Sequence, residues 1–232
     1  METQKIYNLI ILDASSSMQT IYSQALSGVN ETLATIRIAQ EKHPELHQYV
    51  TLASFSAGTH FLNRIYSAVP IAEAHNITKK EYPLLGCTAL YDAMGTCISE
   101  LQHHVSHGDR VLVTIITDGY ENSSITWDKY QIKNLVDELR QMGWTFTYIG
   151  ADQDVEKVAH EIGVRNSLRF SANAEDTEKM FKKERNCRTL FYSRVLCNNS
   201  MDDCCDYFAD DDNENEAEPK PNKNPLSKLF GK

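Results

Sequence analysis

Apolar runs of strand length alternate along the chain with longer amphipathic stretches, and this alternation restricts the fold more than any other feature of the sequence. Three of the runs, 6–12, 110–117 and 144–149, consist mostly of apolar and β-branched residues. Such runs are typical of parallel strands that are covered on both faces. The stretches between them repeat their apolar residues at helical spacing. The sequence therefore predicts an α/β fold, with helices on both faces of a mostly parallel sheet.

A full reading of the alternation gives six strands and five helices. The expected strands are 6–12, 49–56, 60–67, 110–117, 144–149 and 167–170, and the expected helices are 21–40, 88–105, 127–142, 154–162 and 175–195. The second and third strands are separated by Ala57, Gly58 and Thr59, which are enough for a hairpin, so we expect one antiparallel edge strand. The other connections run through helices and predict a doubly wound, Rossmann-like sheet.

The alternation ends near residue 197, and the composition changes there. Between Asp202 and Glu218 the chain has nine Asp and Glu residues and no Lys or Arg, and the end is rich in Pro, Asn and Lys. This part holds too little apolar material to bury, so we expect one domain over 1–197 and a disordered acidic tail over 198–232. The apolar residues within 225–230 suggest a short docking peptide at the end of that tail.

Charge, hydropathy and cysteine content exclude several classes of function. The net charge of −9 comes largely from the tail, so the body has no broad basic surface and we expect no nucleic-acid partner. No apolar run approaches the roughly 20 residues needed to cross a bilayer, so no membrane partner is expected. The first residues lack the features of a signal peptide, which predicts a cytoplasmic location. Six cysteines without a CxxC pair favour buried or incidental thiols over disulfides or zinc.

Oxygen-bearing side chains occur in three separate loops next to the expected strands and helices. Asp13, Ser15 and Ser17 follow the first strand, Thr88 opens a helix, and Asp118 follows the strand 110–117. Ligands of open α/β sheets bind beyond the carboxyl ends of the strands, where the strand order reverses, and adjacent first and fourth strands would bring the two aspartates together. Two carboxylates with neutral hydroxyls favour Mg²⁺, or alternatively Mn²⁺ or Ca²⁺, over zinc.

Each of the three loops also has a simpler interpretation. Asp and Ser are among the best N-cap residues, so the Asp13 loop and Thr88 could merely begin helices. Asp118 followed by Gly119 could be an ordinary turn. These interpretations treat each loop alone, whereas a metal site explains all three together. Ser16 lies between the two ligand serines and is not expected to bind the metal.

Other polar residues in or near these loops are not expected to bind the metal. Tyr120, Glu121 and Asn122 follow Asp118 and are expected to form a rim that contacts a partner, or otherwise a solvated loop. His103 and His107 have the spacing of a metal pair on a helix, but a helix C-terminus also favours histidine and no third ligand is evident. Asp92 and Glu100 are expected on a solvent-facing side of the helix 88–105, where they would contribute only to solubility.

The three segments together resemble the von Willebrand factor A family. The D-x-S-x-S segment, the threonine of G-x-T-A-L and the aspartate of T-D-G match its metal-ion-dependent adhesion site. The order of elements is similar to that of the family over about residues 5–195. The resemblance implies that Ser15, Ser17 and Thr88 ligate through hydroxyls, and that Asp13 and Asp118 act directly or through water. The chain is most similar to small, intracellular, stand-alone bacterial A domains, some of which are linked to tellurite resistance and stress operons. Because 18–20 has no acidic residue, no adjacent second metal site is expected.

The family resemblance implies a protein-binding module rather than an enzyme. The Mg²⁺ ion would complete its coordination with an Asp or Glu side chain from a protein partner. An alternative is a Mg²⁺-dependent phosphoryl-transfer enzyme similar to haloacid-dehalogenase-like phosphatases, with Asp13 as nucleophile. Such an enzyme needs a carboxylate two positions later as general acid and base, where this chain has Ser15. A third alternative is a scaffold whose site is degenerate and binds no metal.

Overall fold

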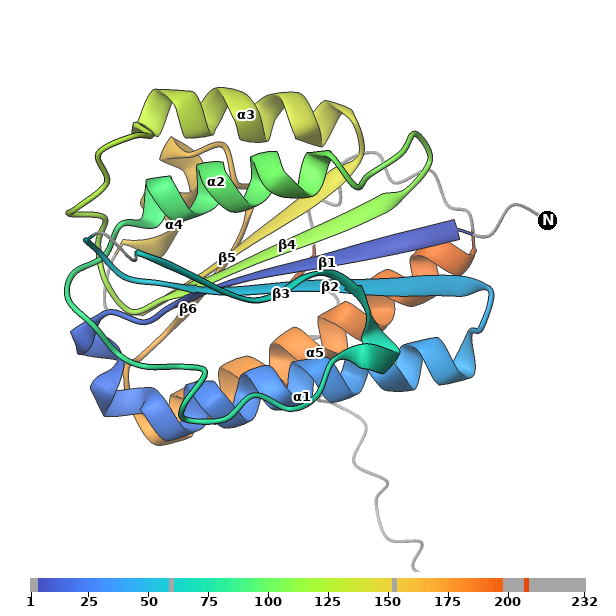
Figure 1. Ribbon diagram of the computed structural model, residues 1–232, viewed down its shortest axis with the longest axis horizontal. Helices are drawn as coiled ribbons and strands as arrows, with labels where there is room; N and C mark the ends of the chain where they lie inside the picture. Colours follow the sequence, from blue (N-terminus) through green and yellow to red (C-terminus); the bar gives the residue numbers. More distant parts are fainter. Residues whose placement is uncertain (1–3, 59–60, 152–153, 198–206, 209–232) are drawn as a thin grey trace, which may run out of the picture.

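The computed structural model describes residues 4–58, 61–151, 154–197 and 207–208. Apart from residues 207 and 208, the predicted tail 198–232 lies outside the described residues, as does the predicted docking peptide at 225–230. The described residues form a single six-stranded sheet with helices against it (Figure 1). The strands are β1 Gln4–Asp13, β2 Leu46–Phe55, β3 Leu62–Pro70, β4 Arg110–Thr117, β5 Trp144–Ala151 and β6 Asn166–Phe170.

The sheet has the order β3-β2-β1-β4-β5-β6. Only β3 is antiparallel to its neighbour, and the pairs β1–β2, β1–β4, β4–β5 and β5–β6 are all parallel. The α/β prediction with one antiparallel edge strand is therefore confirmed. The order reverses between β1 and β4, which places the point where such sheets bind ligands directly after these two strands.

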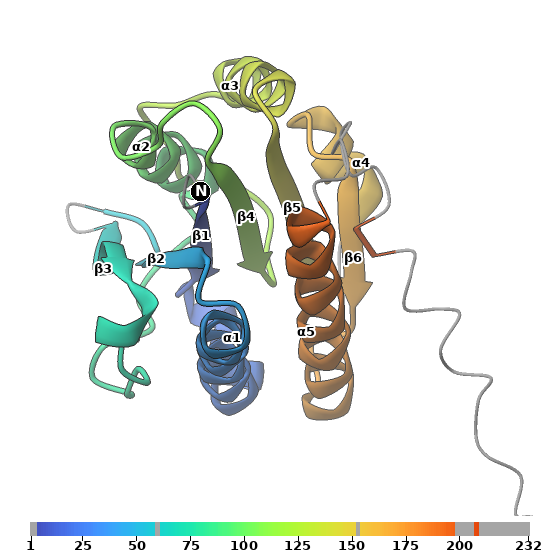
Figure 2. The ribbon, with the colours of Figure 1, turned by 90° about the vertical axis from the view of Figure 1, so that its right-hand side faces the viewer.

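Helices cover both faces of the sheet. They are α1 Tyr22–Lys42, α2 Leu90–Gln102, α3 Lys129–Gln141, α4 Val155–Glu161 and α5 Ala174–Leu196, with short 3₁₀ helices η1 Ser16–Ile21 and η2 Ile71–Glu73. Figure 2 shows α1 and α5 side by side below the sheet, with α2 and α3 on the opposite side. Two hydrophobic clusters, one under each helix layer, form the core. No helix among the described residues is long and apolar enough to cross a membrane.

The first helix differs from its prediction. The segment expected to be helical from residue 21 is preceded by η1, which begins at Ser16 within the predicted ligand loop. Met18 and Ile21 of η1 are buried, and this burial fixes the loop against the core. The chain that leaves β1 therefore turns at once into a packed 3₁₀ segment, and the serines at its start occupy defined positions.

A buried ion pair fastens α5 to the sheet. Arg188 and Glu184 are both buried, and Arg188 Nη2 lies 2.7 Å from Glu184 Oε1. The same guanidinium donates to Asn8 Oδ1 of β1 at 2.9 Å and to Thr114 Oγ1 of β4 at 2.7 Å. The predicted helix 175–195 is thus correct in extent, but its charges are not all on the surface.

The predicted domain boundary at residue 197 leaves out part of the core. Tyr207 and Phe208 are buried, and they belong to the hydrophobic cluster under α1 and α5. The Tyr207 backbone N–H donates to Asn166 Oδ1 at 3.1 Å, and the Tyr207 ring lies 6.3 Å from that of Phe191. For these two residues the expectation of a disordered tail is wrong, because their aromatic side chains have an apolar site to fill.

Candidate metal centre

The carboxyl ends of β1 and β4 lie next to each other, as the site prediction requires. Leu12 of β1 pairs with Ile116 of β4, so Asp13 and Thr117 end the two strands side by side. The Thr117 hydroxyl donates to Asp13 Oδ2 at 2.6 Å. Asp118 follows directly, and the loops that carry the predicted ligands therefore start from one edge of the sheet.

Asp13 is a carboxylate held in a fully buried position. Its exposed fraction is 0%, and its Oδ1 accepts the backbone N–H of Ser15 at 2.7 Å. Burial raises the pKa of Asp13 to about 6, because removal from water disfavours the charged form, while the bonds from Thr117 and Ser15 act in the opposite direction. A cation beside this carboxylate would offset the cost of its desolvation.

The two ligand serines and Asp118 form a continuous chain of short contacts. Ser15 Oγ lies 2.9 Å from Ser17 Oγ, and the Ser17 hydroxyl donates to Asp118 Oδ1 at 2.6 Å. Ser15 and Ser17 therefore project toward Asp118 on the same side of their loop. Ser16 is exposed, and its backbone N–H donates instead to Gly86 O at 3.0 Å.

Thr88 reaches the same place from a third loop. A Cβ atom built on Gly119 would lie 3.4 Å from Thr88 Oγ1 and 3.7 Å from Ser17 Oγ. The two hydroxyls thus approach one point beside the Gly119 backbone, and the missing side chain leaves that point free of carbon. The structure brings together the five residues predicted as metal ligands, which we name the oxygen cluster: Asp13, Ser15, Ser17, Thr88 and Asp118.

Helix capping does not account for these hydroxyls. Ser15 is the N-cap residue of η1, but its side chain makes no capping hydrogen bond. The N-cap of α2 is Ala89, one residue after Thr88, and it too has no side-chain cap. The capping interpretation is therefore wrong for both segments, and the hydroxyls are directed toward the oxygen cluster.

Residues after Asp118 position the ligand loops, a role that the sequence analysis missed. Asn122 holds Thr88 by two bonds, since Thr88 N–H donates to Asn122 Oδ1 at 3.0 Å and Asn122 N–H donates to Thr88 O at 3.1 Å. The Glu121 carboxylate accepts backbone N–H groups from Tyr91 at 2.9 Å and Ser124 at 2.7 Å. Of the three residues predicted as a rim, Glu121 and Asn122 therefore bond to other loops of the chain, while Tyr120 is exposed.

Asp92 corrects one expectation directly. It was expected on a solvent-facing side of its helix, but it is 5% exposed. Its carboxylate accepts the backbone N–H groups of Ile125, Thr126 and Trp127 at 2.7–2.9 Å. Asp92 therefore organises the loop that follows Asp118. Glu100 does lie at the surface, where it pairs with Arg64.

The donor set fits a hard divalent cation. It consists of two carboxylates and three hydroxyls, which suits Mg²⁺, Mn²⁺ or Ca²⁺ better than a metal that prefers nitrogen or sulfur. In the part of the chain that the structure describes, no group of three or more His, Cys, Asp or Glu residues could hold a metal ion. The histidine pair at His103 and His107 accordingly has no third ligand there.

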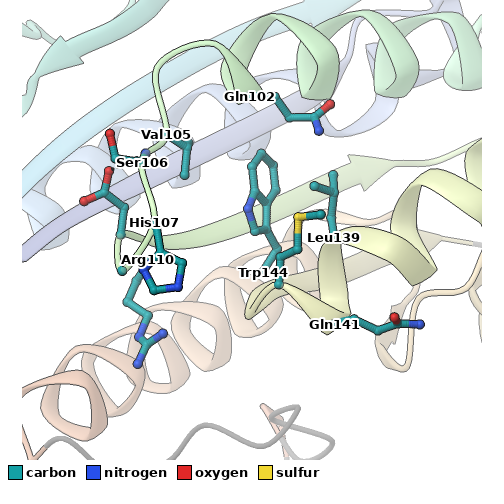
Figure 3. Close-up of a pocket in the computed structure, with 11 residues that line it drawn as sticks. Gln102, Val105, Ser106, His107, Arg110, Leu139, Gln141 and Trp144 are labelled. Carbon is teal, nitrogen blue, oxygen red and sulfur yellow. Dashed lines mark hydrogen bonds between the residues drawn. The ribbon is translucent and has the colours of Figure 1, made fainter.

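A cavity of about 590 Å³ lies at the opposite end of the parallel strands, where β4 and β5 begin (Figure 3). Its walls include His107, Arg110, Leu139 and Trp144. None of its lining residues belongs to the oxygen cluster. Because ligands of open α/β sheets bind beyond the carboxyl ends of the strands, the oxygen cluster rather than this cavity has the expected position of a binding site.

Comparison with solved structures found similar folds in proteins of low sequence identity. The pilus adhesin SpaC from Lactobacillus rhamnosus GG matches with a TM-score of 0.62 at 12% identity, covering 83% of this chain and 31% of that one. The PilB minor pilin from Streptococcus sanguinis matches with a TM-score of 0.56 at 13% identity, covering 86% and 64%. Proximal thread matrix protein 1 from the mussel byssus, with a zinc-occupied MIDAS motif, gives 0.54 at 11% identity, covering 81% and 46%.

These matches describe a shared domain rather than whole proteins. The chain spans from 31% to 64% of the lengths of these three structures. No curated protein sequence matches this chain. The model of the von Willebrand factor type A domain matches residues 9–184, more than half of the sequence, and that range includes all five residues of the oxygen cluster. The chain therefore belongs to the von Willebrand factor type A domain family.

Proposed function

We propose that the protein is a non-enzymatic, Mg²⁺-dependent protein-binding module. The observation that carries this proposal is the convergence of five oxygen ligands from three distant loops. Their hydroxyls cap no helix, and those of Ser15 and Ser17 contact each other and Asp118. Family membership and the zinc-occupied site of the mussel protein support metal binding at this position. The partner is a protein that presents an Asp or Glu side chain to the metal.

Each residue of the site has a separate part in this function. Ser15, Ser17 and Thr88 would hold the ion through neutral hydroxyls, and Asp118 and Asp13 would supply the charge. The bound ion supplies a coordination position that a carboxylate from outside the chain can fill. Two carboxylates neutralise a divalent ion without excess negative charge, so an incoming carboxylate meets no net repulsion from the site.

The site is poorly suited to phosphoryl transfer. A nucleophilic aspartate must reach its substrate, whereas Asp13 is 0% exposed and both of its oxygens accept hydrogen bonds. A general acid two positions later is also needed, and Ser15 stands there. Incubation with a generic phosphomonoester and Mg²⁺ should therefore give no turnover above that of Asp13→Asn. Turnover that is lost in Asp13→Asn would favour the phosphatase alternative.

We also propose a reducing compartment, the cytoplasm, as the setting of this module. Cys87, Cys97 and Cys197, in the described part of the chain, are free thiols. Cys87 is exposed and one residue from Thr88. An exposed thiol next to a ligand is easier to maintain in a reducing compartment than in an oxidising one.

The metal site can be tested with two neighbouring serines. Isothermal titration of Mg²⁺ into the full chain, after removal of metal by EDTA and dialysis, should show a single site. Ser15→Ala should weaken Mg²⁺ binding by at least about tenfold, because a ligand is lost. Ser16→Ala, the matched control one residue away, should bind Mg²⁺ like the wild type, since the Ser16 side chain does not belong to the contacts that join Ser15, Ser17 and Asp118. Equal losses in the two variants, or no binding by the wild type, would contradict the proposed site.

A further inference from the structure

Three exposed apolar side chains lie in loops that are bonded to, or continuous in sequence with, the segments that carry the proposed ligands. Leu85, Tyr120 and Ile125 are 56%, 55% and 93% exposed, and we name these three residues the apolar rim. All three lie in loops beyond the carboxyl ends of the parallel strands. Most large apolar side chains of a folded domain are buried, so several exposed ones on one edge indicate a surface that contacts something else.

The Leu85 part of the apolar rim is joined directly to the ligand loop of β1. The Leu85 backbone N–H donates to Ala14 O at 2.8 Å, and Gly86 O accepts the Ser16 N–H at 3.0 Å. These two bonds hold Leu85 next to the segment that carries Ser15 and Ser17. The Leu85 backbone is therefore held beside the loop that carries two of the proposed ligands.

The Ile125 part is fixed even more firmly. The buried Asp92 carboxylate accepts the N–H of Ile125 at 2.9 Å and those of Thr126 and Trp127. The Trp127 ring in turn packs on Gly95 of α2. An aliphatic side chain that is 93% exposed thus stands on a loop held by a buried carboxylate and a packed indole. Loop tips more often carry polar residues, so this rigid presentation of an isoleucine requires a reason.

Tyr120 completes the rim on the side of Asp118. It is separated from that ligand only by Gly119, and its hydroxyl accepts the backbone N–H of Asp154 at 3.4 Å. The phenol is thereby tied to the start of α4 while much of the ring remains exposed. Tyrosine is enriched at the energetic centres of protein interfaces because it combines a large apolar face with a polar end.

We propose that the apolar rim selects the partner, and that the recognised segment carries an acidic residue flanked by large apolar side chains. This inference rests on the proposed function, since the acidic residue is the one that reaches the metal. The rim is continuous with the ligand loops, so a segment that places its carboxylate at the oxygen cluster lies across these side chains. A single carboxylate competes with water for the metal, and burial of apolar area adds about 25 cal/mol per Å² to the binding free energy.

The test uses random linear peptides displayed on phage as the probe. The full-length protein is immobilised and panned in Mg²⁺, and the bound phage are eluted with EDTA. One arm uses the wild type, a second uses Leu85→Ser/Tyr120→Ser/Ile125→Ser, and a third uses Ile38→Ser/Met142→Ser. Ile38 and Met142 are also exposed apolar residues, but they lie near the C-terminal ends of α1 and α3, away from the oxygen cluster.

The expected result distinguishes the contribution of the apolar rim to peptide binding from that of the metal. Peptides enriched by the wild type should contain Asp or Glu next to large apolar residues. The most enriched peptide, made synthetically, should bind the triple variant at least about tenfold more weakly and the control variant equally well. Calorimetry should give the same Mg²⁺ affinity for all three proteins.

Two outcomes would overturn the inference, and they differ from each other. Enriched peptides that share an acidic residue but no apolar neighbour, or that bind the triple variant unchanged, would remove the role of the rim and leave the metal-dependent function intact. A lack of any EDTA-sensitive enrichment would instead contradict the proposed function itself, together with the inference that rests on it.

Discussion

Asp13 is the residue at which the chemistry of the site and the stability of the fold meet. Its carboxylate lies at the end of a central strand, out of contact with water, and accepts hydrogen bonds from Ser15 and Thr117. Two bonds do not fully replace the hydration of a carboxylate, and burial accordingly raises the pKa of Asp13 to about 6. Without a cation, the folded state therefore keeps this proton to a higher pH than the unfolded chain does.

This preference predicts a pH dependence for the metal-free protein. The pKa of Asp13 is about 6 in the folded protein against an ordinary value of 3.8, so between these values the folded state keeps a proton that the unfolded chain has lost. Stability should therefore fall as pH rises through this window and level off above it, by about 1 to 2 kcal/mol between about pH 5 and pH 7.5. Urea unfolding of the wild type in EDTA measures this change.

Asp13→Asn is the matched control for that experiment. Asparagine can still accept the Ser15 N–H and can donate to Thr117 Oγ, but it carries no charge. The difference in unfolding free energy between Asp13→Asn and the wild type should grow with pH over the same window. A difference that stays constant with pH would mean that Asp13 does not titrate there.

At this scale, the sequence predicts the ligands better than the residues that hold them. Asp13 and Asp118 could be found because each follows a recognisable strand. Asn122 and Asp92 could not, because their roles depend on backbone N–H groups and carbonyls in distant segments, which leave no spacing pattern in the sequence. The most informative signal was the position of Asn122 shortly after Asp118, and it suggested a partner contact rather than a clamp on Thr88.

Among the elements, α5 has the least expected packing. Its buried Arg188 and Glu184 pair with each other, and Arg188 reaches Asn8 and Thr114 on two strands. Loss of one member of a buried pair leaves an uncompensated charge, which typically costs about 3–5 kcal/mol, whereas replacing both members by apolar residues can be neutral. We expect Arg188→Met to destabilise the protein by about that amount, and Glu184→Leu/Arg188→Met to recover much of the loss.

Denaturant unfolding of these two variants tests the role of the buried pair. Arg185→Met is a matched control on the same helix, because Arg185 pairs with Glu31 at the surface, where such pairs contribute about 0–1 kcal/mol. A loss in Arg188→Met no larger than that in Arg185→Met would show that the buried pair does not hold α5.

Element boundaries and element interiors differ in how well the sequence predicts them. The strand over 110–117 was predicted with its observed ends, because its apolar run stops sharply at Asp118. The 3₁₀ segment η1 was not predicted, because its serines and threonine carry no helical pattern and its form depends on burial of Met18 and Ile21. The buried pair of α5 was not predicted, since a sequence does not reveal which charged residues have buried partners.

At the scale of the whole molecule, the two ends of the parallel strands carry different features. The carboxyl ends carry the oxygen cluster and the apolar rim. The end at which the strands begin holds the cavity beside Trp144 (Figure 3). Tyr207 and Phe208 also lie there, since Tyr207 bonds to the first residue of β6. Tyr207 N–H bonds to Asn166 at the start of β6, and Tyr207 Oη lies 3.4 Å from Glu184 Oε1. Tyr207 and Phe208 thus pack into the core of the domain.

Truncated chains can measure how much Tyr207 and Phe208 contribute to the stability of the domain. A chain of residues 1–208 should unfold at nearly the same temperature as the full protein. A chain of residues 1–206 lacks both aromatic side chains, and removal of a buried aromatic side chain typically costs about 3–5 kcal/mol, so its melting temperature should fall clearly. Tyr207→Ala/Phe208→Ala in the full-length protein should reproduce that loss, which excludes an effect of chain length.

The two truncations also distinguish a closed core from a peripheral contact. Because Tyr207 touches the Arg188–Glu184 network, its loss should affect α5, and native-state hydrogen exchange of α5 should accelerate in the chain of residues 1–206. Mg²⁺ affinity should stay unchanged, since the oxygen cluster lies at the opposite end of the parallel strands. Equal melting temperatures for the two truncated chains would return the domain boundary to residue 197 and make the two aromatic residues dispensable for folding.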